Sequence, residues 1–275
     1  MPRLDDYTVI MSVYKKVKPE HLKESINSIL RQTHVTNEFI IIKDGDLSPE
    51  AEKIIQEFKK KNKLIFKVHG FKDNAGAGRS YNKALSLCTN KWAAIMDSDD
   101  IAHPEKFEKQ LQYLSTHKKI DVIGTNAIEF IDEENHIYAK RKMPKTNDEI
   151  IKFGHARCPL IQPTAIFRVD SVKKAGSYQE SPLTEDYDLY IRMIMNGCNF
   201  FNLQEYLYSI RTSKDFFKRR GGIKYLSKIL RFKYKYYKKG FYSSYEFFKT
   251  STASIVAAML PNKIRVLVYK KFLRN

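Results

Sequence analysis

Cysteine is scarce in this chain of 275 residues. The three cysteines, Cys88, Cys158 and Cys198, stand far apart and lack the paired spacing of a zinc or redox site. We therefore expect no disulfide framework, and a reducing, cytoplasmic compartment fits this cysteine content best.

Long apolar runs are absent as well. The longest run near the C-terminus spans residues 255–260 and stops at Pro261, far short of the roughly 20 residues that cross a bilayer. Residues 1–6 lead directly into a strand-like run, without the basic and then apolar region of a secretion signal. We therefore expect neither secretion nor a membrane-spanning segment.

Acidic residues are nearly missing from the last part of the chain. Residues 216–275 hold 16 Lys or Arg and one acid, Glu246, whereas the first 215 residues hold 33 Lys or Arg and 30 acids. The net charge of +18 is therefore mostly a property of the tail. A near-neutral body with a basic, aromatic tail indicates a catalytic domain with an attachment segment. No recognised nucleic-acid-binding motif accompanies the charge, so we expect no nucleic acid partner.

Strand-like and helix-like patterns alternate in the first part of the chain. Apolar and β-branched runs predict strands at residues 7–14, 39–42, 64–68 and 92–96. Helices are predicted from Pro19, from an N-cap at Ser48 and over residues 78–88. This alternation favours an α/β fold with a mostly parallel sheet and helices on its faces.

The pattern is less regular in the second part. A helix leads to a short strand at residues 122–123, and irregular sequence follows up to residue 165. A further helix over residues 186–195, closed by Gly197, precedes a strand at residues 200–203.

An acidic cluster, Asp97-Ser98-Asp99-Asp100, follows the strand that ends the regular part. Ligands bind beyond the carboxyl ends of strands in such sheets, where Asp44 also lies. Alternate residues of an extended segment point the same way, so Asp97 and Asp99 can converge on one metal cation or one nucleotide while Asp100 faces elsewhere. Such a cation neutralises a diphosphate leaving group. The alternative is an acidic turn without function, because turns favour Asp and Ser.

A glycine-bearing loop over residues 74–82 enters a helix. Gly76 and Gly78 allow close approach of a phosphate or a sugar to the backbone. Tyr81 replaces the third glycine of a dinucleotide fingerprint, and the loop lies far from the first strand, so we expect no nicotinamide cofactor. Helix capping by Asn74 and Ser80 is the alternative explanation of the loop.

Together these residues resemble family 2 inverting glycosyltransferases of the GT-A fold. Four segments carry the resemblance: Asp44-Gly45, Asn74-x-Gly76, Asp97-x-Asp99-Asp100 and Glu185-Asp186-Tyr187-Asp188-Leu189. The resemblance covers residues 7–220 and is strongest to bacterial enzymes that build capsular, exopolysaccharide or lipopolysaccharide glycans. It implies a Rossmann-like, nucleotide-binding α/β domain with a mostly parallel central sheet flanked by helices, followed here by a C-terminal helical tail.

The resemblance implies a nucleotide diphosphate sugar as the donor, and a UDP- or dTDP-sugar is expected. In the family, the acid after the second strand contacts the uracil or thymine base, which makes Asp44 the candidate here. Lys43 stands where many relatives carry another Asp, so the base contact would depend on one carboxylate.

The same resemblance gives roles to further donor-binding residues. Asp97 would contact the ribose or the metal, and Asp99 would bind the metal beneath the diphosphate. Asn74, Gly76 and Arg79 complete the donor-binding set, with Arg79 as a charged contact to phosphate or a plain surface residue. The implied cofactor is Mg²⁺ or Mn²⁺.

On the acceptor side, the resemblance assigns the general base to Asp186, which would take the proton of the attacking hydroxyl. Glu185 and Asp188 are then supporting acids that position the acceptor or the helix. The alternative is that these acids only stabilise the start of a helix through its dipole. Residues 158–164 resemble a family segment that lines the acceptor side, with Gln162 in a position that often carries His.

Arg219 and Arg220 follow the predicted body and are candidates for a loop that folds over the diphosphate. The alternative is that they only begin the basic tail.

The tail carries a helical pattern of its own. At about 100° per residue, six cations share one face: Lys224, Lys228, Arg231, Lys235, Lys238 and Lys239. Apolar and aromatic residues fall on the other face. A basic amphipathic helix of this kind favours an anionic membrane surface as its partner. The alternative is a helix packed on the body with a solvated basic face.

We therefore predict a donor-binding half over residues 1–105, an acceptor-binding half of the same domain over residues 106–212 and a membrane-associating tail over residues 213–275. The expected reaction transfers a sugar, with inversion, to a hydroxyl of a growing and lipid-linked surface glycan at the inner face of the cytoplasmic membrane. One rival is a sugar nucleotidyltransferase, which would carry a glycine-rich, Arg-bearing loop after its first strand. The other rival is a non-catalytic protein that binds a nucleotide or an anionic polymer.

Overall fold

The computed structural model describes residues 4–131, 134, 136–179, 181, 184–212 and 222–260. Its strands are β1 (Tyr7–Tyr14), β2 (Glu38–Asp44), β3 (Phe66–Phe71), β4 (Trp92–Asp97), β5 (Ile101–Ala102), β6 (Val122–Phe130), β7 (Ile137–Arg141), β8 (Ile166–Arg168) and β9 (Phe200–Arg211). Its α-helices are α1 (Pro19–Leu30), α2 (Pro49–Lys61), α3 (Ala77–Leu87), α4 (Lys106–Thr116), α5 (Asn147–Gly154), α6 (Val169–Lys174), α7 (Glu185–Met195), α8 (Ile223–Lys238) and α9 (Ser244–Met259). A 3-10 turn, Gln162–Thr164, precedes β8.

Local sequence signals explain where several helices begin. Both α1 and α2 carry proline in the first turn, where no backbone N–H donor is needed. The Ser48 hydroxyl accepts a hydrogen bond from the Ala51 N–H at 3.2 Å and caps α2, as predicted. A reciprocal cap between Thr146 and Glu149 begins α5.

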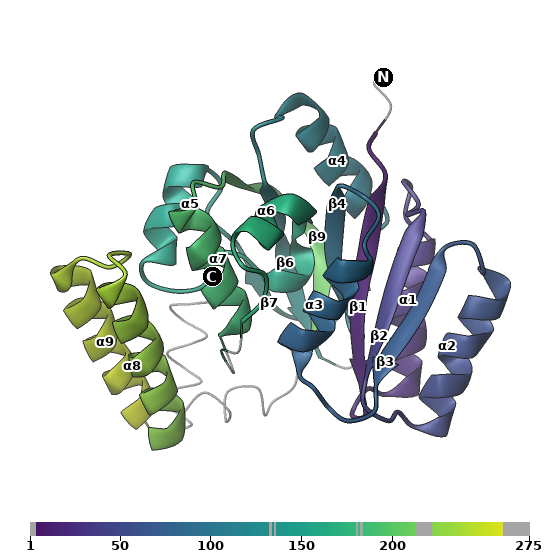
Figure 1. The fold of residues 1–275 in the computed structure, drawn as a ribbon, viewed down its shortest axis with the longest axis horizontal. Coiled ribbons are helices and arrows are strands. Elements are labelled where there is room, and N and C mark those ends of the chain that lie inside the picture. The colour runs from purple at the N-terminus through teal and green to yellow at the C-terminus, as the bar shows by residue number, and fades with distance from the viewer. Residues whose placement is uncertain are drawn as a thin grey trace.

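The strands form one sheet in the order β3-β2-β1-β4-β8-β6-β9-β5, with β7 paired to β6. Strands β3, β2, β1 and β4 are parallel, as the alternation of strands and helices predicts. Strand β8 runs antiparallel to both β4 and β6 and joins the parallel part to the rest of the sheet. Helices cover both faces of the sheet, so the α/β fold class predicted from the sequence is confirmed (Figure 1).

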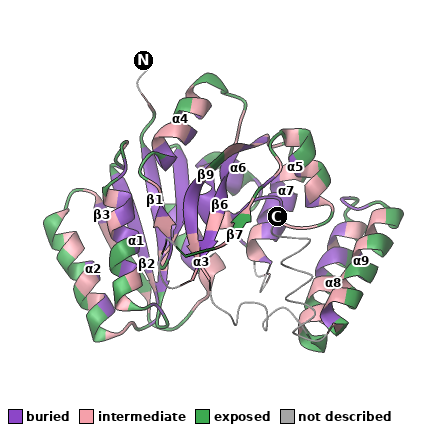
Figure 2. Cartoon of the chain, turned by 180° about the vertical axis from the view of Figure 1, so that it is seen from behind, coloured by how far each residue is buried: buried purple, intermediate pink, exposed green. Residues whose placement is uncertain are grey.

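Side chains of the central strands alternate between two hydrophobic cores, one on each face of the sheet. In β1, Val9 and Met11 belong to the core under α1, α2 and α4, whereas Ile10 belongs to the core under α3 and α7. The central strands are buried and the outer faces of the helices are exposed (Figure 2). Parallel strands covered on both faces appear in a sequence as nearly continuous apolar runs, which is why these strands are predictable.

Two strands are much longer than the sequence pattern predicts. Strand β6 continues to Phe130 and β9 to Arg211, although the apolar runs end at Ile123 and Leu203. The two strands pair in parallel with shifts of register, and polar residues such as Asn126 lie buried in this ladder. These polar residues interrupt the apolar pattern on which the prediction depends. The stretch predicted to be irregular also contains α5 and β7.

Helices α8 and α9 form a hairpin that packs on α7 (Figure 1). Phe232, Tyr236 and Tyr242 form a small hydrophobic cluster with Tyr187 and Ile191 of α7. The face of α8 that carries Phe232 and Tyr236 is therefore packed on the body, as the alternative interpretation of the tail predicts. The sequence pattern did not predict α9. Within the described part of the chain, no helix is both long and apolar enough to span a membrane.

Candidate active site

Two acidic residues end the strands on either side of β1, at one edge of the sheet. The register of β1 pairs Tyr14 with Asp44 of β2 and Ser12 with Asp97 of β4. Because β1 lies between these strands, the two acids stand at the carboxyl edge on either side of it. In α/β sheets this edge is where ligands bind.

Asp44 holds the glycine-bearing loop against this edge. Its buried carboxylate accepts hydrogen bonds from the Asn74 amide (2.9 Å) and from the N–H groups of Ala75 (2.6 Å) and Gly76 (3.1 Å). Gly45 has a φ of +85°, and a Cβ there would lie 3.0 Å from the Asn74 nitrogen, so only glycine fits. Contact between Asp44 and a nucleotide base stays a prediction. The structure shows in addition that Asp44 stabilises the conformation of the loop.

The acids of the cluster after β4 differ in burial: Asp97 is half-buried and Asp99 is exposed, whereas Asp100 is buried. The Asp97 Oδ1 atom accepts a hydrogen bond from the Tyr81 hydroxyl at 3.2 Å, and Asp99 is exposed. Asp100 is buried, and its Oδ1 atom accepts a hydrogen bond from the Arg211 N–H at 2.8 Å. This bond ties the end of β4 to the end of β9, which leaves Asp97 and Asp99 as the candidate metal ligands.

Burial and mutual repulsion oppose ionisation of these carboxyl groups. Burial, followed by the neighbouring Asp99 charge, raises the pKa of Asp97 to about 7. The side chain of Asp99 is exposed, but the surrounding protein partly desolvates its carboxyl group, which raises its pKa as well. A divalent cation would relieve this repulsion, and two carboxylates with diphosphate and water oxygens fit Mg²⁺ or Mn²⁺. Among the described residues, no group of three or more His, Cys, Asp or Glu side chains could hold a metal ion. A cation at Asp97 and Asp99 would therefore depend on the bound ligand for the rest of its shell.

Asp186 lies in the first turn of α7, near the acids that follow β4. After burial and Asp99, its charge contributes to the raised pKa of Asp97. Its Oδ1 atom accepts a hydrogen bond from the Tyr187 N–H at 2.7 Å, and its Oδ2 atom accepts one from the Cys158 thiol at 3.6 Å. The start of a helix also stabilises a carboxylate through the helix dipole. The direction of the Asp186 contribution to the pKa of Asp97 is consistent with Asp186 on the same side of the sheet as the donor acids, although they lie far apart in the sequence.

A chain of buried aromatic residues links the donor acids to α7. The Tyr81 ring packs on Tyr178, with ring centroids 5.1 Å apart. Gln162 donates a hydrogen bond to the Tyr178 hydroxyl (3.0 Å) and accepts one from the Tyr190 hydroxyl of α7 (3.1 Å). Burial raises the pKa of Tyr178, and the charge of Glu185 adds to the shift, so this predicted supporting acid lies near the same cluster.

Asp188, the other predicted supporting acid, faces the C-terminal hairpin. Its fully buried carboxylate accepts hydrogen bonds from Arg192 (2.8 Å), Lys235 (2.6 Å) and the Tyr236 hydroxyl (2.7 Å). Burial opposes ionisation of Asp188, but these three partners outweigh burial and lower its pKa. The sequence pattern predicts that Lys235 belongs to a membrane-facing set of cations, and the structure shows that its ammonium group is already bonded to this buried acid.

The structure places only one of the three arginines predicted for the site. Arg79 is exposed in the first turn of α3, whereas Arg219 and Arg220 lie outside the described residues. Arg211, which the sequence pattern does not single out, donates a hydrogen bond to the Asp99 carbonyl at 3.0 Å. The prediction missed it because the strand that carries it was predicted to end too early.

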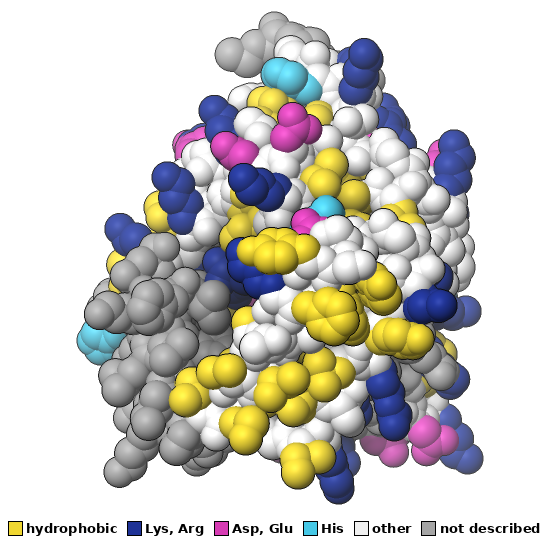
Figure 3. All heavy atoms as spheres, turned by 90° about the vertical axis from the view of Figure 1, so that its left-hand side faces the viewer, with side chains coloured by type: hydrophobic (Ala, Val, Ile, Leu, Met, Phe, Trp, Pro, Cys, Tyr) yellow, Lys and Arg dark blue, Asp and Glu magenta, His cyan; other side chains and the backbone are white. Residues whose placement is uncertain are grey.

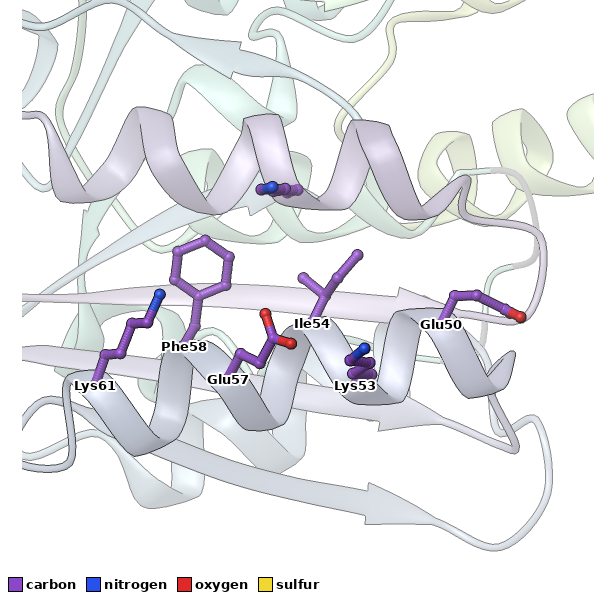
Figure 4. A pocket seen from close by; sticks show the side chains of 7 residues that line it. Glu50, Lys53, Ile54, Glu57, Phe58 and Lys61 are labelled. Carbon is purple, nitrogen blue, oxygen red and sulfur yellow. The ribbon is translucent and has the colours of Figure 1, made fainter.

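A groove between α1 and α2 lies apart from this site (Figure 4). Charged side chains of both helices surround two apolar residues of α2, and the lining residues are Lys23, Glu50, Lys53, Ile54, Glu57, Phe58 and Lys61. None of them belongs to the predicted site. Mixed charges three or four residues apart are typical of a solvated helix surface.

Comparison with known proteins adds to this geometry. The family model described as "Glycosyl transferase family 2" matches residues 8–176. This span includes the loop and the donor acids but ends before α7.

Individual relatives match nearly the whole chain. The UDP-Gal:alpha-D-GlcNAc-diphosphoundecaprenol beta-1,3-galactosyltransferase of Escherichia coli is 31% identical, over 98% of this chain and 97% of its own length. The amylovoran biosynthesis glycosyltransferase AmsE of Erwinia amylovora is 31% identical, over 96% of this chain and 98% of its own length. Both alignments extend beyond the span of the family model, to α7 and the C-terminal hairpin.

A solved structure shares the fold. The mannosyltransferase PcManGT from Pyrobaculum calidifontis, in complex with GDP-Man and Mn²⁺, aligns with a TM-score of 0.67 and 11% identity. The alignment covers 98% of this chain and 74% of that chain. At this level of identity the likeness concerns the fold alone.

Proposed function

Because the chain belongs to glycosyl transferase family 2, we propose that it moves a sugar, with inversion, from a nucleotide diphosphate to a glycan hydroxyl. Its fold is the GT-A type of its structural neighbours.

The chain of contacts between Asp97 and α7 is the observation that carries the proposal. Tyr81 bonds Asp97 and packs on Tyr178, and Gln162 joins Tyr178 to Tyr190 of α7, the helix whose first turn holds Asp186. A base on α7 would thus face the space in which Asp97 and Asp99 hold the diphosphate. Inverting transfer needs this arrangement, since the base and the leaving group act on opposite sides of the anomeric carbon.

The proposed reaction is a single displacement. Asp186 accepts the proton of the acceptor hydroxyl, whose oxygen forms a bond to the anomeric carbon from the face opposite the diphosphate. The bond between that carbon and the diphosphate oxygen breaks, and the nucleoside diphosphate leaves. Asp44 and its loop hold the nucleotide side of the donor, and the hydrogen bonds of Asp186 to Cys158 and Tyr187 orient the base.

We assign Mg²⁺ or Mn²⁺ to Asp99 and Asp97. When bound, the cation would act as a Lewis acid that neutralises the leaving diphosphate. The all-oxygen ligands and the raised pKa of both carboxyl groups support this assignment. The Mn²⁺ in the complex of the mannosyltransferase of like fold supports it as well.

The donor and acceptor are proposed from similarity. We assign the donor to residues 1–105 and the acceptor to residues 106–212. The name of the Escherichia coli relative contains UDP-Gal as donor and a diphosphoundecaprenol-linked sugar as acceptor. Identity of 31% over nearly the whole chain supports a UDP-sugar and a lipid-linked acceptor here, with a dTDP-sugar as the other donor to test.

We also propose that residues 213–275 associate with an anionic membrane surface, at the inner face of the cytoplasmic membrane. Residues 216–275 hold 16 Lys or Arg and one acid, which supports attraction to anionic lipids. Such association would keep the enzyme close to a lipid-linked acceptor.

Nucleoside diphosphate release by the purified protein tests this function. We expect release from one of a set of UDP-, dTDP- and GDP-sugars with Mg²⁺ or Mn²⁺, and its loss in EDTA or in Asp99→Asn. The matched control Asp46→Asn changes an exposed acid at the same edge and should keep wild-type release. Unchanged release in EDTA would contradict the metal assignment. Binding of nucleotide without release from any donor would favour the non-catalytic rival.

A further inference from the structure

Helix α9 presents its large apolar side chains to solvent. Tyr245, Phe248, Val256 and Met259 are 72%, 67%, 55% and 77% exposed. At about 100° per residue they fall within an arc of about 80°, so they form one continuous line along the helix, here named the α9 stripe. Figure 3, in which this end of the molecule faces the viewer, shows hydrophobic side chains gathered over this face.

The opposite side of α9 packs inward through Phe247 and small residues. The Phe247 ring stacks on Tyr237 of α8 with ring centroids 4.7 Å apart. Ser251 and Ala258 are buried, and the Ser254 hydroxyl accepts a hydrogen bond from Lys233 of α8 at 2.9 Å. A helix that only covers a globular body buries its large apolar side chains and exposes its polar face. Because α9 exposes four large apolar side chains on one face, this face is a candidate interaction surface.

The hairpin that carries the α9 stripe is strongly cationic. Its exposed cations are Lys249, which lies beside the stripe on α9, and Lys224, Lys228, Arg231, Lys238 and Lys239 of α8 and its C-cap. The one acid among residues 222–260 is Glu246, whose Oε1 atom lies 2.6 Å from the Nδ1 atom of His155 on the body. An occupant of this face must therefore be apolar toward the stripe and compatible with the net positive charge of the hairpin.

We infer that the α9 stripe docks on an anionic lipid bilayer. A second copy of the chain would place an equally cationic hairpin against this one, which charge repulsion disfavours. Residues 261–275 hold five Lys or Arg and no acid, so the same objection applies to that segment. A bilayer meets both requirements, because interfacial helices bury an apolar face below the headgroups while Lys and Arg contact anionic lipids.

This inference rests on the membrane association proposed above and changes the surface that makes the contact. The sequence pattern assigns the contact to the basic face of α8, but Lys235 of that face is bonded to Asp188. The structure instead turns the α9 stripe outward. Because α8 packs on α7, a docked hairpin would hold α7 and Asp186 close to the membrane surface.

Co-sedimentation of the full-length protein with vesicles tests the inference. We expect wild-type protein to bind vesicles of phosphatidylglycerol and phosphatidylcholine at low salt, and to bind phosphatidylcholine alone much less. The combined variant Phe248→Ser, Val256→Ser, Met259→Ser should bind at least about tenfold more weakly, since it removes three apolar anchors. Leu64→Ser is the matched control, because it removes a 98% exposed apolar side chain from the body and should bind like wild type.

Tryptophan fluorescence gives a second measurement that does not depend on the combined variant. We expect Phe248→Trp emission to shift to shorter wavelength on addition of the anionic vesicles, because the indole enters an apolar environment. Leu64→Trp should show no shift.

The outcomes separate this inference from the proposed function. If the combined variant binds vesicles as tightly as wild type and Phe248→Trp shows no fluorescence shift, the α9 stripe is not the docking surface. Membrane association would then be left to the basic face of α8. Failure of wild-type protein to bind anionic vesicles would overturn both membrane statements, while donor turnover in solution tests the catalytic proposal independently. Self-association that the combined variant abolishes, without vesicle binding, would identify a second copy as the occupant.

Discussion

Among single residues, Asp44 is the one whose expected role changes most once its contacts in the structure are known. The resemblance gives it a contact with the nucleotide base, whereas the structure surrounds its carboxylate with three donors of the 74–76 loop. We expect Asp44→Asn to lower the free energy of unfolding by about 1.5–3 kcal/mol without any nucleotide, because an amide cannot accept all of these hydrogen bonds. Chemical denaturation measures this, with Asp46→Asn as the control. Unchanged stability would limit Asp44 to a donor contact.

Asp186 is the residue on which the proposed chemistry depends. We expect Asp186→Asn to lower sugar transfer by about 10² to 10⁴, the usual contribution of a general base. The affinity for the nucleoside diphosphate should stay near wild type, because Asp44, Asp97 and Asp99 are unchanged. Transfer assays and calorimetric titration with nucleotide measure the two effects. Wild-type transfer by this variant would move the base to another acid, with Glu185 the first to test.

The candidate site could be predicted as a set of acids but not as a set of contacts. Asp97, Asp99 and Asp186 are recognisable because each stands in a short acidic pattern at the end of a strand or the start of a helix. Tyr81 and Cys158, which bond to two of these acids, belong to no such pattern. Their partners lie far away in the sequence, so only the fold brings them together.

Among the elements, α8 combines two roles that its sequence pattern does not separate. Lys235 and Lys238 both belong to its basic side, but Lys235 is bonded to the buried Asp188 and Lys238 is exposed. We expect Lys235→Met to lower the free energy of unfolding by about 1.5–3 kcal/mol, the range for a hydrogen bond to a charged group. Lys238→Met should change it by less than about 0.5 kcal/mol. Equal effects in urea denaturation would contradict the assigned contact, and Lys235→Arg should restore part of the loss.

Helix α9 is held to the body partly by a contact between Glu246 and His155. Glu246 bonds His155 and also accepts hydrogen bonds from the N–H (2.9 Å) and hydroxyl (2.8 Å) of Ser243. Burial would raise the pKa of Glu246, but these partners outweigh burial and lower it from 4.5 to about 2. A folded-state pKa below the unfolded value means that the ionised group stabilises the fold above pH 4.5.

The stability difference between wild type and Glu246→Gln should therefore shrink as the pH falls from 4.5 toward 2. Denaturation of both proteins at about pH 5.5 and about pH 3.5 measures this difference, with the larger value expected at the higher pH. A difference that is equal at both values, or larger at the lower one, would contradict the ionised contact.

For the whole molecule, the sequence predicts the parallel part of the sheet better than the rest. Strands β1, β2 and β4 are covered on both faces, and their apolar runs are visible without any knowledge of the fold. Strands β6 and β9 stabilise each other through a long ladder with buried polar residues such as Asn126 and Asn202, so neither strand is visible alone. The hairpin of α8 and α9 likewise depends on its packing against α7.

The central claim is that this molecule places a base and a diphosphate site on opposite sides of an anomeric carbon. The anomeric configuration of the transferred sugar tests this most directly. The measurement is a nuclear magnetic resonance spectrum of the product formed from the active donor and a diphosphate-lipid-linked sugar acceptor. We predict a glycosidic bond with the configuration opposite to that of the donor, formed by wild-type protein and strongly reduced in Asp186→Asn. A product that retains the configuration of the donor would contradict the claim.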